Sequence, residues 1–264
     1  MQAADAPPPA PRAGPLYRGV AAVAFGAMSA QRWQFDHRGI GHIPAAGGAV
    51  LAANHNSFWD FFTVGRGPYR ELGRPVRILA KESLFRVPVF GAVMHAAGHI
   101  PVHRGSGASA LSSAVEALQR GELVLVLPEQ TISPSFELLP FKHGAARMAQ
   151  MAGVPLIPTA SWGSHRFHTV RRRPRWSWRL PIVTSHGAPV PTSGRAVEDV
   201  TADLRARVGA LLDDAVATYP DGTPPGAWWV PARLGGSAPT PEQAAEHVQR
   251  LASRWRPPSR RQAS

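Results

Sequence analysis

The amino-acid sequence predicts an α/β fold, a mostly parallel sheet flanked by helices, from three observations. Short apolar runs alternate with segments of helical periodicity from Ile40 to about Val190, a pattern typical of strands joined by crossover helices. The runs are apolar throughout, which is expected of strands that are covered on both faces. Glycines stand where the helical segments stop, as they do at many helix C-termini.

The predicted elements follow one another in a regular order. The helix between the third and fourth apolar runs has Ser109 as its N-cap and Gly121 as its stop, and the next helix ends at Gly153. A strand-like run from Ile182 to Ser185 and an amphipathic helix from Val197 to Leu212 follow these helices. The five apolar runs that we predict as strands are Ala49–Ala53, Val76–Ala80, His99–Val102, Leu123–Leu127 and Val154–Trp162.

Composition limits the classes of protein to consider. The chain has 264 residues, of which 44% are hydrophobic, so it is able to bury a core and is not disordered throughout. Lys and Arg number 29 against 17 Asp and Glu, a net charge of +12 that predicts a negatively charged partner: anionic lipid, a phosphate-bearing substrate or nucleic acid. The absence of cysteine excludes disulfides, a thiol nucleophile and cysteine-ligated metals.

The N-terminal region predicts a short helix at a membrane interface. The segment from Leu16 to Trp33 is small and apolar in its middle, carries Arg18 and Arg32 near its ends, and is followed by Phe35. Cations and aromatic rings at the ends of a short apolar segment suit the interface better than the membrane interior, and the segment is shorter than the ~20 residues that a transmembrane helix needs. A helix packed on the domain is the other interpretation.

These observations divide the chain into four expected segments. A disordered tail occupies residues 1–15 and the interfacial helix residues 16–38. The main domain covers residues 39–220, and residues 221–264 form an extension that contains Pro, Gly and Trp. In this extension Trp228 and Trp229 are either a second interfacial anchor or part of a buried core.

Polar residues that follow the first apolar run suggest a catalytic pair. His55 and Asp60 are five residues apart, which suits a loop followed by a helix start, with Ser57 as the cap. A carboxylate bound to one ring nitrogen of His55 leaves the other nitrogen free to take a proton, so the pair would act as a general base on a hydroxyl of the substrate. A loop histidine beside a helix-start charge is the alternative.

The residues around this pair resemble those of a known family. Asn54-His55-x-Ser57-x-x-Asp60 resembles the His-x4-Asp motif of the glycerolipid acyltransferases, which include the 1-acylglycerol-3-phosphate acyltransferases. The resemblance spans roughly Ile40 to Ser164. Further segments that match in the family's order are Lys81-Glu82-Ser83-Leu84, Gly98-His99-Ile100-Pro101-Val102-His103-Arg104, Leu127-Pro128-Glu129-Gln130-Thr131-Ile132-Ser133 and Val154-Pro155-Leu156-Ile157-Pro158.

The resemblance implies a reaction and a set of site residues. His55 is then the general base and Asp60 the residue that stabilises the imidazolium, while Arg104 holds the phosphate of the acceptor. Glu129 helps to arrange the acceptor site, and Thr131 adds a hydroxyl contact; a turn cap is the alternative role for Glu129. The implied reaction moves a fatty acyl group from acyl-CoA or acyl carrier protein to a lysophospholipid such as 1-acyl-sn-glycerol 3-phosphate, in phospholipid biosynthesis at the cytoplasmic face of the cell membrane. We expect no cofactor and no metal.

The third motif departs from the family pattern. Gln130 replaces the usual glycine and Ile132 the usual arginine, so one phosphate-binding cation is missing and the backbone has less freedom at Gln130. Lys142 either substitutes for that charge or is an exposed lysine. Another lipid acceptor, such as a glycolipid without the phosphate, also explains the loss.

The most basic stretch, Ser161 to Leu180, interleaves arginines with tryptophans. This composition suits an anionic membrane surface, the acidic face of an acyl carrier protein or the phosphates of coenzyme A, and it also fits a solvated loop. Two further functions remain in view. One is a nucleic-acid-binding module, which the charge alone supports, and the other is an inactive relative that binds lipid without turnover.

Overall fold

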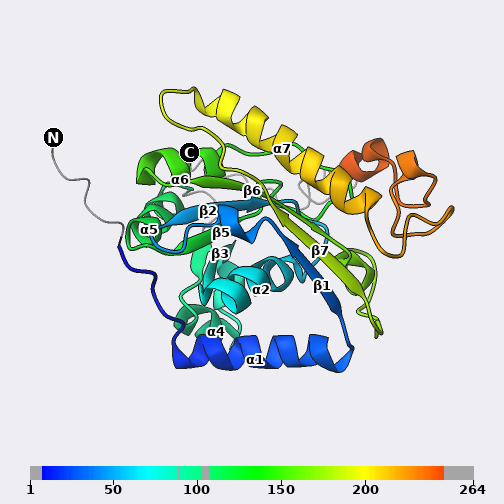
Figure 1. The fold of residues 1–264 in the computed structure, drawn as a ribbon, viewed down its shortest axis with the longest axis horizontal. Helices are drawn as coiled ribbons and strands as arrows, with labels where there is room; N and C mark the ends of the chain where they lie inside the picture. Colours follow the sequence, from blue (N-terminus) through cyan, green and yellow to red (C-terminus); the bar gives the residue numbers. More distant parts are fainter. Residues whose placement is uncertain (1–7, 89, 103–106, 247–264) are drawn as a thin grey trace, which may run out of the picture.

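A seven-stranded sheet in the order β1-β7-β6-β2-β5-β3-β4 forms the centre of the molecule (Figure 1). The computed structural model describes residues 8–88, 90–102 and 107–246. Strands β2 to β6 run parallel to one another, whereas β7 is antiparallel to β6 and β1 is parallel to β7, so the predicted mostly parallel sheet is confirmed. The strands are β1 Gln34–Arg38, β2 Ala49–Ala53, β3 Val76–Lys81, β4 Ile100–Val102, β5 Leu123–Val126, β6 Leu156–Trp162 and β7 Pro181–His186.

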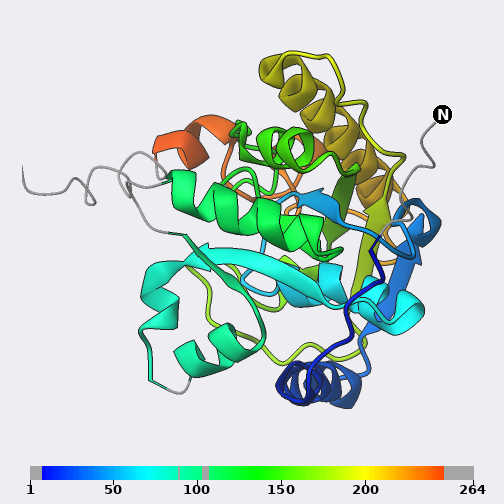
Figure 2. The same cartoon turned by 90° about the vertical axis from the view of Figure 1, so that its left-hand side faces the viewer.

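Helices cover both faces of the sheet. Figure 2 shows α7 and α1 on opposite sides of it, and Figure 1 shows α5 and α6 on the side of α7. In β2, Val50 and Ala52 pack in the cluster that contains α5, α6 and α7, whereas Ala49, Leu51 and Ala53 pack in the cluster on the side of α2. The longer helices are α1 Pro15–Ala30, α2 Asp60–Leu72, α5 Gly107–Gln119, α6 Gly144–Ala152 and α7 Val197–Ala217, and the short elements are α3 Glu82–Phe85, α4 Phe90–Ala96, η1 Ile40–His42, η2 Ser164–Arg166 and η3 Ala232–Leu234.

The predicted helix stops coincide with backbone conformations that favour glycine. Gly153, with φ of 64°, caps α6, and Gly121, with φ of 84°, follows the end of α5. The start of α5 was predicted less well, because the helix begins at Gly107 rather than after Ser109. Stops were easier to predict than starts here because only glycine adopts a positive φ without strain.

The N-terminal helix is shorter than predicted. It ends at Ala30, and residues 34–38, expected in the same helix, form β1, whose backbone pairs with β7 from Gln34↔Pro181 to Arg38↔Ser185. One face of α1 buries Ala21, Ala24 and Met28 against the domain, while the opposite face leaves Val23 75% exposed. Among the residues that the structure describes, no helix has the length and apolar content to span a membrane.

Part of the segment predicted as a C-terminal extension belongs to the core. Trp229 and Val230 are buried in one cluster with Trp162 of β6 and Tyr219, beyond the end of α7. Trp228 packs against this cluster. Of the two interpretations of the adjacent tryptophans, burial in the core is therefore correct for Trp229.

A buried arginine ties together the loops at the amino ends of the strands. Arg74 is 1% exposed and donates hydrogen bonds to the carbonyl oxygens of Pro44, Gly47 and Gly121. Gly47 precedes β2 and Gly121 precedes β5, so Arg74 holds the end of the sheet opposite to the carboxyl ends of its parallel strands.

Candidate active site

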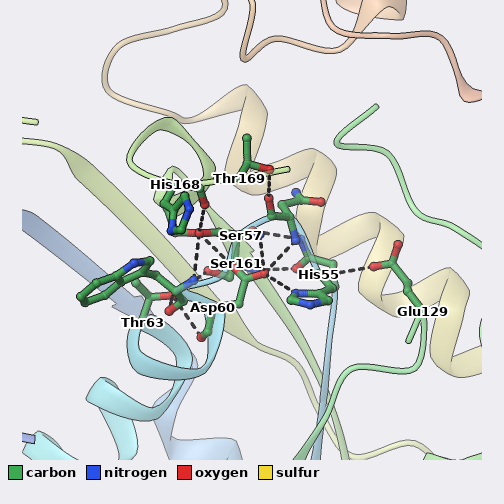
Figure 3. Close-up of polar contacts among 12 residues, drawn as sticks. His55, Ser57, Asp60, Thr63, Glu129, Ser161, His168 and Thr169 are labelled. Atoms are coloured by element: carbon green, nitrogen blue, oxygen red, sulfur yellow. Dashed lines mark hydrogen bonds and ion pairs between the residues drawn. The ribbon is translucent and has the colours of Figure 1, made fainter. Parts of the chain in front are cut away.

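The carboxyl ends of β2, β5 and β6 bring three polar loops together. These strands are neighbours in the sheet, so the loops that follow them, residues 54–60, 127–133 and 163–169, meet at one edge. Functional groups gather at this edge in α/β sheets. Figure 3 shows side chains from all three loops in one hydrogen-bonded group, with His55 between Asp60 and Glu129.

His55 and Asp60 are in contact, as their spacing predicted. Asp60 is the first residue of α2, and its Oδ2 lies 3.0 Å from Nδ1 of His55. The Asp60 side chain is fully buried, whereas that of His55 is 19% exposed. An acceptor on Nδ1 places the proton of the neutral ring there, so Nε2 is the nitrogen that accepts a proton from another molecule.

The helix start differs from the prediction. Trp59, not Ser57, occupies the N-cap position of α2, and it makes no side-chain capping bond. The Ser57 hydroxyl accepts a hydrogen bond from the backbone N–H of Trp59 at 3.0 Å and donates one to the carbonyl oxygen of His168 at 2.7 Å. This hydroxyl therefore braces the loop from both sides.

The Asp60 carboxylate accepts four hydrogen bonds in all. Besides the imidazole of His55, its Oδ2 accepts the backbone N–H of Asn56 at 2.7 Å and of Ser57 at 2.8 Å. Its Oδ1 accepts the hydroxyl of Ser164 at 2.7 Å. Four donors around a buried carboxylate stabilise its negative charge and fix its orientation, so the imidazole has a rigid anionic partner.

The backbone of His55 is held on both sides by the loop after β5. Its N–H donates to Oε1 of Glu129 at 2.7 Å, and its carbonyl oxygen accepts from the N–H of Ser133 at 2.8 Å. The other oxygen of Glu129 accepts the backbone N–H of Leu139 at 2.9 Å. Glu129 is 6% exposed, and this burial raises its pKa to about 8. Both of its oxygens are thus engaged by main-chain donors, which makes it a positioning residue for His55.

Comparison with known proteins agrees with this geometry. A family model described as Acyltransferase matches residues 34–162, which run from the start of β1 to the end of β6 and include His55, Asp60 and Glu129. Residues 34–162 of the chain belong to the acyltransferase family. The family resemblance inferred from the motifs is therefore confirmed.

Curated relatives of this chain include plant and bacterial proteins. The chain is 33% identical over 125 residues to a 1-acyl-sn-glycerol-3-phosphate acyltransferase of Bacillus subtilis, which covers 46% of the chain and 59% of that protein. It is 31% identical over 136 residues to the chloroplastic enzyme BAT2 of the same description from Brassica napus, which covers 50% of the chain and 38% of that protein. The matched part thus spans less than two thirds of either relative's length.

A solved structure shares the fold. The 1-acyl-sn-glycerophosphate (LPA) acyltransferase PlsC from Thermotoga maritima superposes with a TM-score of 0.63 at 22% identity. The match covers 77% of the present chain and 80% of the other. The α/β arrangement of this chain is therefore found in an experimental structure as well.

Of the three remaining predicted site residues, two lie in or beside the loop after β5, and the third is outside the described residues. Thr131 is half-buried two residues after Glu129 in the same loop. Lys142 is exposed, and its backbone N–H donates to the carbonyl oxygen of Pro128 at 2.9 Å, so it lies beside that loop. Arg104, the predicted phosphate ligand, lies outside the described residues.

The two departures in the third motif have distinct structural consequences. Gln130 adopts a φ of 59°, the left-handed conformation that glycine favours, so the loop keeps this backbone shape without the glycine. Ile132 is 5% exposed and packs inward. An apolar contact thus occupies the position where the family pattern has an arginine.

Sequence reasoning missed the contribution of the loop after β6. Besides Ser164, which reaches Asp60, the hydroxyl of Thr169 donates to the carbonyl oxygen of Asn56 at 2.7 Å. The side chain of Asn54 pairs with the backbone of Ser161, so it extends the contact between β2 and β6 past the end of β2. The signal was available, because serines at 161 and 164 lie at the end of a predicted strand as His55 does.

The arrangement suits base catalysis by a single imidazole. A buried carboxylate orients the ring, the backbone of His55 is fixed at both its N–H and its carbonyl, and the His55 side chain is 19% exposed. Within residues 8–88, 90–102 and 107–246, no three His, Asp or Glu side chains gather closely enough to hold a metal ion.

Proposed function

We propose that this chain is an O-acyltransferase that moves a fatty acyl group from a thioester donor, acyl-CoA or acyl carrier protein, to the hydroxyl of a lysophospholipid. The acceptor that the relatives' names favour is 1-acyl-sn-glycerol 3-phosphate, which would place the reaction in phospholipid biosynthesis. The observation that carries the proposal is the contact of His55 Nδ1 with the buried Asp60 carboxylate at 3.0 Å, in the region matched by the family model.

The proposed mechanism starts with proton transfer to His55. Nε2 of His55 takes the proton of the acceptor hydroxyl while that oxygen attacks the thioester carbonyl carbon. The resulting imidazolium is stabilised by Asp60. When the tetrahedral intermediate collapses, the C–S bond breaks, and the proton on His55 passes to the departing sulfur, which leaves as a thiol. General base assistance supplies about 10²- to 10⁴-fold of the rate, and positioning of donor and acceptor supplies much of the rest.

Direct transfer fits the residues near His55 better than an acyl-enzyme. The chain has no cysteine. The hydroxyl of Ser57, two residues from His55, donates its proton to the carbonyl oxygen of His168, and that of Ser164 donates to Asp60. Neither hydroxyl is hydrogen-bonded to the imidazole, as an activated nucleophile would be.

The residues that would bind the acceptor phosphate are proposed from their side-chain chemistry. We propose Arg104 as its ligand, because a guanidinium binds a phosphate through two parallel hydrogen bonds, with Lys142 as a second cation and Thr131 as a hydroxyl contact. The apolar packing of Ile132 supports a second candidate, an acyltransferase whose lipid acceptor lacks the phosphate. We expect the reaction at the cytoplasmic face of the cell membrane, where thioester donors and lysolipids meet, with the protein attached peripherally.

A transfer assay tests the proposal. Purified protein is incubated with labelled acyl-CoA or acyl carrier protein and with 1-acylglycerol 3-phosphate, a monoacylglycerol or a glycolipid. His55→Ala is compared with His95→Ala, which removes an exposed histidine of α4. We expect the first variant to lose about 10²-fold or more of the rate and the second to keep it. Transfer that survives in His55→Ala would contradict the mechanism.

The panel of acceptors separates the candidate functions. A strong preference for the phosphate-bearing acceptor supports the lysophospholipid assignment, and equal use of the monoacylglycerol favours the second candidate. Binding of lysolipid without transfer to any acceptor would instead identify an inactive relative.

A further inference from the structure

Two exposed tryptophans lie in one loop between β6 and β7. Residues 171–179, which we call the tryptophan loop, contain Trp176 at 72% exposure and Trp178 at 55%. In Figure 1 this loop lies at the lower right, beside the C-terminal end of α1. Tryptophan buries most of its surface in ordinary folded domains, so two exposed indoles in one loop point to an interaction surface.

The structure holds the loop in place. Backbone N–H groups on either side of Trp178 donate to Gln31 at the end of α1, from Ser177 to the side-chain oxygen at 3.0 Å and from Arg179 to the carbonyl oxygen at 2.8 Å. The guanidinium of Arg32 lies 5.2 Å from the ring of Trp178. Because Gln31 anchors both flanks, the outward position of this tryptophan is built into the fold.

The charge of the surrounding segment has one sign. Residues 163–180 contain six arginines and no Asp or Glu. Two of these arginines contact other parts of the protein. Arg166 donates to Tyr219 and Asp221 and lies over Trp229, and Arg172 lies 3.9 Å from the ring of Trp228.

Three further arginines of the tryptophan loop, Arg173, Arg175 and Arg179, are exposed. Exposed guanidinium groups beside exposed indoles match a bilayer interface. The rings enter at headgroup depth while the cations meet anionic phosphates. A rigid protein partner would require a matching concave acidic surface, whereas lipid adapts to the two protruding rings.

The tryptophan loop is also connected to the candidate active site. The backbone N–H of Arg175 donates to the carbonyl oxygen of Phe167 at 3.0 Å. The next residue, His168, accepts the Ser57 hydroxyl, and its ring lies 4.6 Å from that of the half-exposed Phe58. The tryptophan loop is thus connected through residues 167 and 168 to Ser57, which lies two residues from His55.

We propose that the tryptophan loop, with Arg32, is a docking surface for anionic bilayers, in which Trp176 and Trp178 enter the headgroup region and Arg173, Arg175 and Arg179 contact lipid phosphates. The docking itself does not depend on the acyl-transfer reaction. Its consequence for an acceptor held in the bilayer rests on the proposed function.

Vesicle binding tests the proposal. The full chain is mixed with phosphatidylcholine vesicles with and without phosphatidylglycerol, and bound protein is measured by flotation. The double variant Trp176→Ser with Trp178→Ser is compared with Met151→Ser, which removes a side chain that is 57% exposed on α6. We expect the double variant to bind anionic vesicles about tenfold more weakly or worse, and Met151→Ser to bind like the wild type.

The arginines give a second, independent comparison. Arg173→Ala and Arg175→Ala are each expected to weaken binding to the anionic vesicles about fivefold at low salt, the factor that corresponds to about 1 kcal/mol per cation near the surface. Arg147→Ala, which removes an exposed arginine of α6, is the control and should change binding little. The wild type should lose binding as salt increases, because screening shortens the reach of these charges.

Several results would overturn the proposal. Undiminished vesicle binding by the double tryptophan variant would show that the loop is not the docking surface. Protection of the loop by acyl carrier protein, or salt-sensitive binding to duplex DNA, together with no vesicle binding would assign the surface to that macromolecule instead.

Transfer assays keep this proposal distinct from the proposed function. With an acceptor dissolved below its critical micelle concentration, the double variant should match the wild type, whereas with the acceptor in vesicles it should be slower. Equal rates in both formats would contradict the link between docking and access to lipid. If the wild type transfers to no acceptor, the proposed function fails and the vesicle experiment still decides the docking.

Discussion

Asp60→Asn separates the charge of Asp60 from its role in the fold. The carboxylate accepts from His55, Asn56 and Ser57 at one oxygen and from Ser164 at the other. The asparagine oxygen can replace the first oxygen and keep three N–H donors satisfied. The new NH2 group then faces the Ser164 hydroxyl, which can rotate to accept from it because a hydroxyl both donates and accepts.

The expected loss of stability in each Asp60 variant depends on how many buried N–H donors keep a hydrogen-bond partner. Asp60→Ala leaves the buried backbone N–H groups of Asn56 and Ser57 without acceptors, at about 1–3 kcal/mol each, so we expect a loss of about 2–6 kcal/mol in the free energy of unfolding. Asp60→Asn keeps those bonds and should cost less than about 2 kcal/mol. Its transfer rate should nevertheless fall about 10²-fold or more, because a neutral amide does not stabilise the imidazolium of His55.

Urea denaturation and the transfer assay are therefore run on both variants. The acceptor's KM should change little in Asp60→Asn, since the loss concerns the protonated ring in the transition state. If Asp60→Asn unfolds as easily as Asp60→Ala, the deduced orientation of the amide is wrong. If it is stable and transfers at the wild-type rate, the charge of Asp60 has no role in the reaction.

Further predictions concern three residues of the surrounding structure, Glu129, Gln130 and Arg74. The pKa of Glu129 is about 8 in the folded state and 4.5 ordinarily, so the folded state binds more protons than the unfolded state between these pH values. The free energy of unfolding should therefore fall as pH rises through this range, and it should fall less in Glu129→Gln. Urea denaturation at several pH values would measure this. Glu129→Gln should also slow transfer, because the N–H groups of His55 and Leu139 bind different oxygens of the carboxylate and the amide NH2 that replaces one oxygen cannot accept. Wild-type rates would refute the positioning role of Glu129. Gln130→Gly should raise thermal stability by up to about 1 kcal/mol by relieving the left-handed backbone, and a lower melting temperature would contradict this. Arg74→Ala should cost about 3 kcal/mol or more while the folded fraction keeps its specific activity, and activity that falls further than the folded fraction would show coupling across the sheet.

Local pattern was sufficient for the parts of the fold that local physics controls. The run Ala49–Ala53 was predicted as a strand and is β2, because five consecutive apolar residues can be buried on both faces of a sheet. The stop at Gly153 followed from the conformation that a helix end requires. The contact of His55 with Asp60 needed only a loop and one helical turn, which five residues span.

Long-range pairing explains where prediction failed. The five residues that form β1 were predicted as the end of a helix. Their conformation is set by backbone pairing with β7, which lies roughly 150 residues later in the chain. Arg166 belongs to the stretch predicted to face a membrane or partner, but its guanidinium donates hydrogen bonds to Tyr219 and Asp221, which are more than 50 residues away in the chain. No window of sequence contains such partners.

The sequence by itself determined the α/β class, the order of its parallel strands along the chain and the family, because apolar runs, glycine stops and ordered motifs are local features. Only the tertiary structure decided which polar residues meet at the site. The sheet order places β2 between β5 and β6, so Glu129 and Ser164, far apart in the chain, both reach the loop of His55 and Asp60. That order is set by packing of whole strands and helices, which no single motif records.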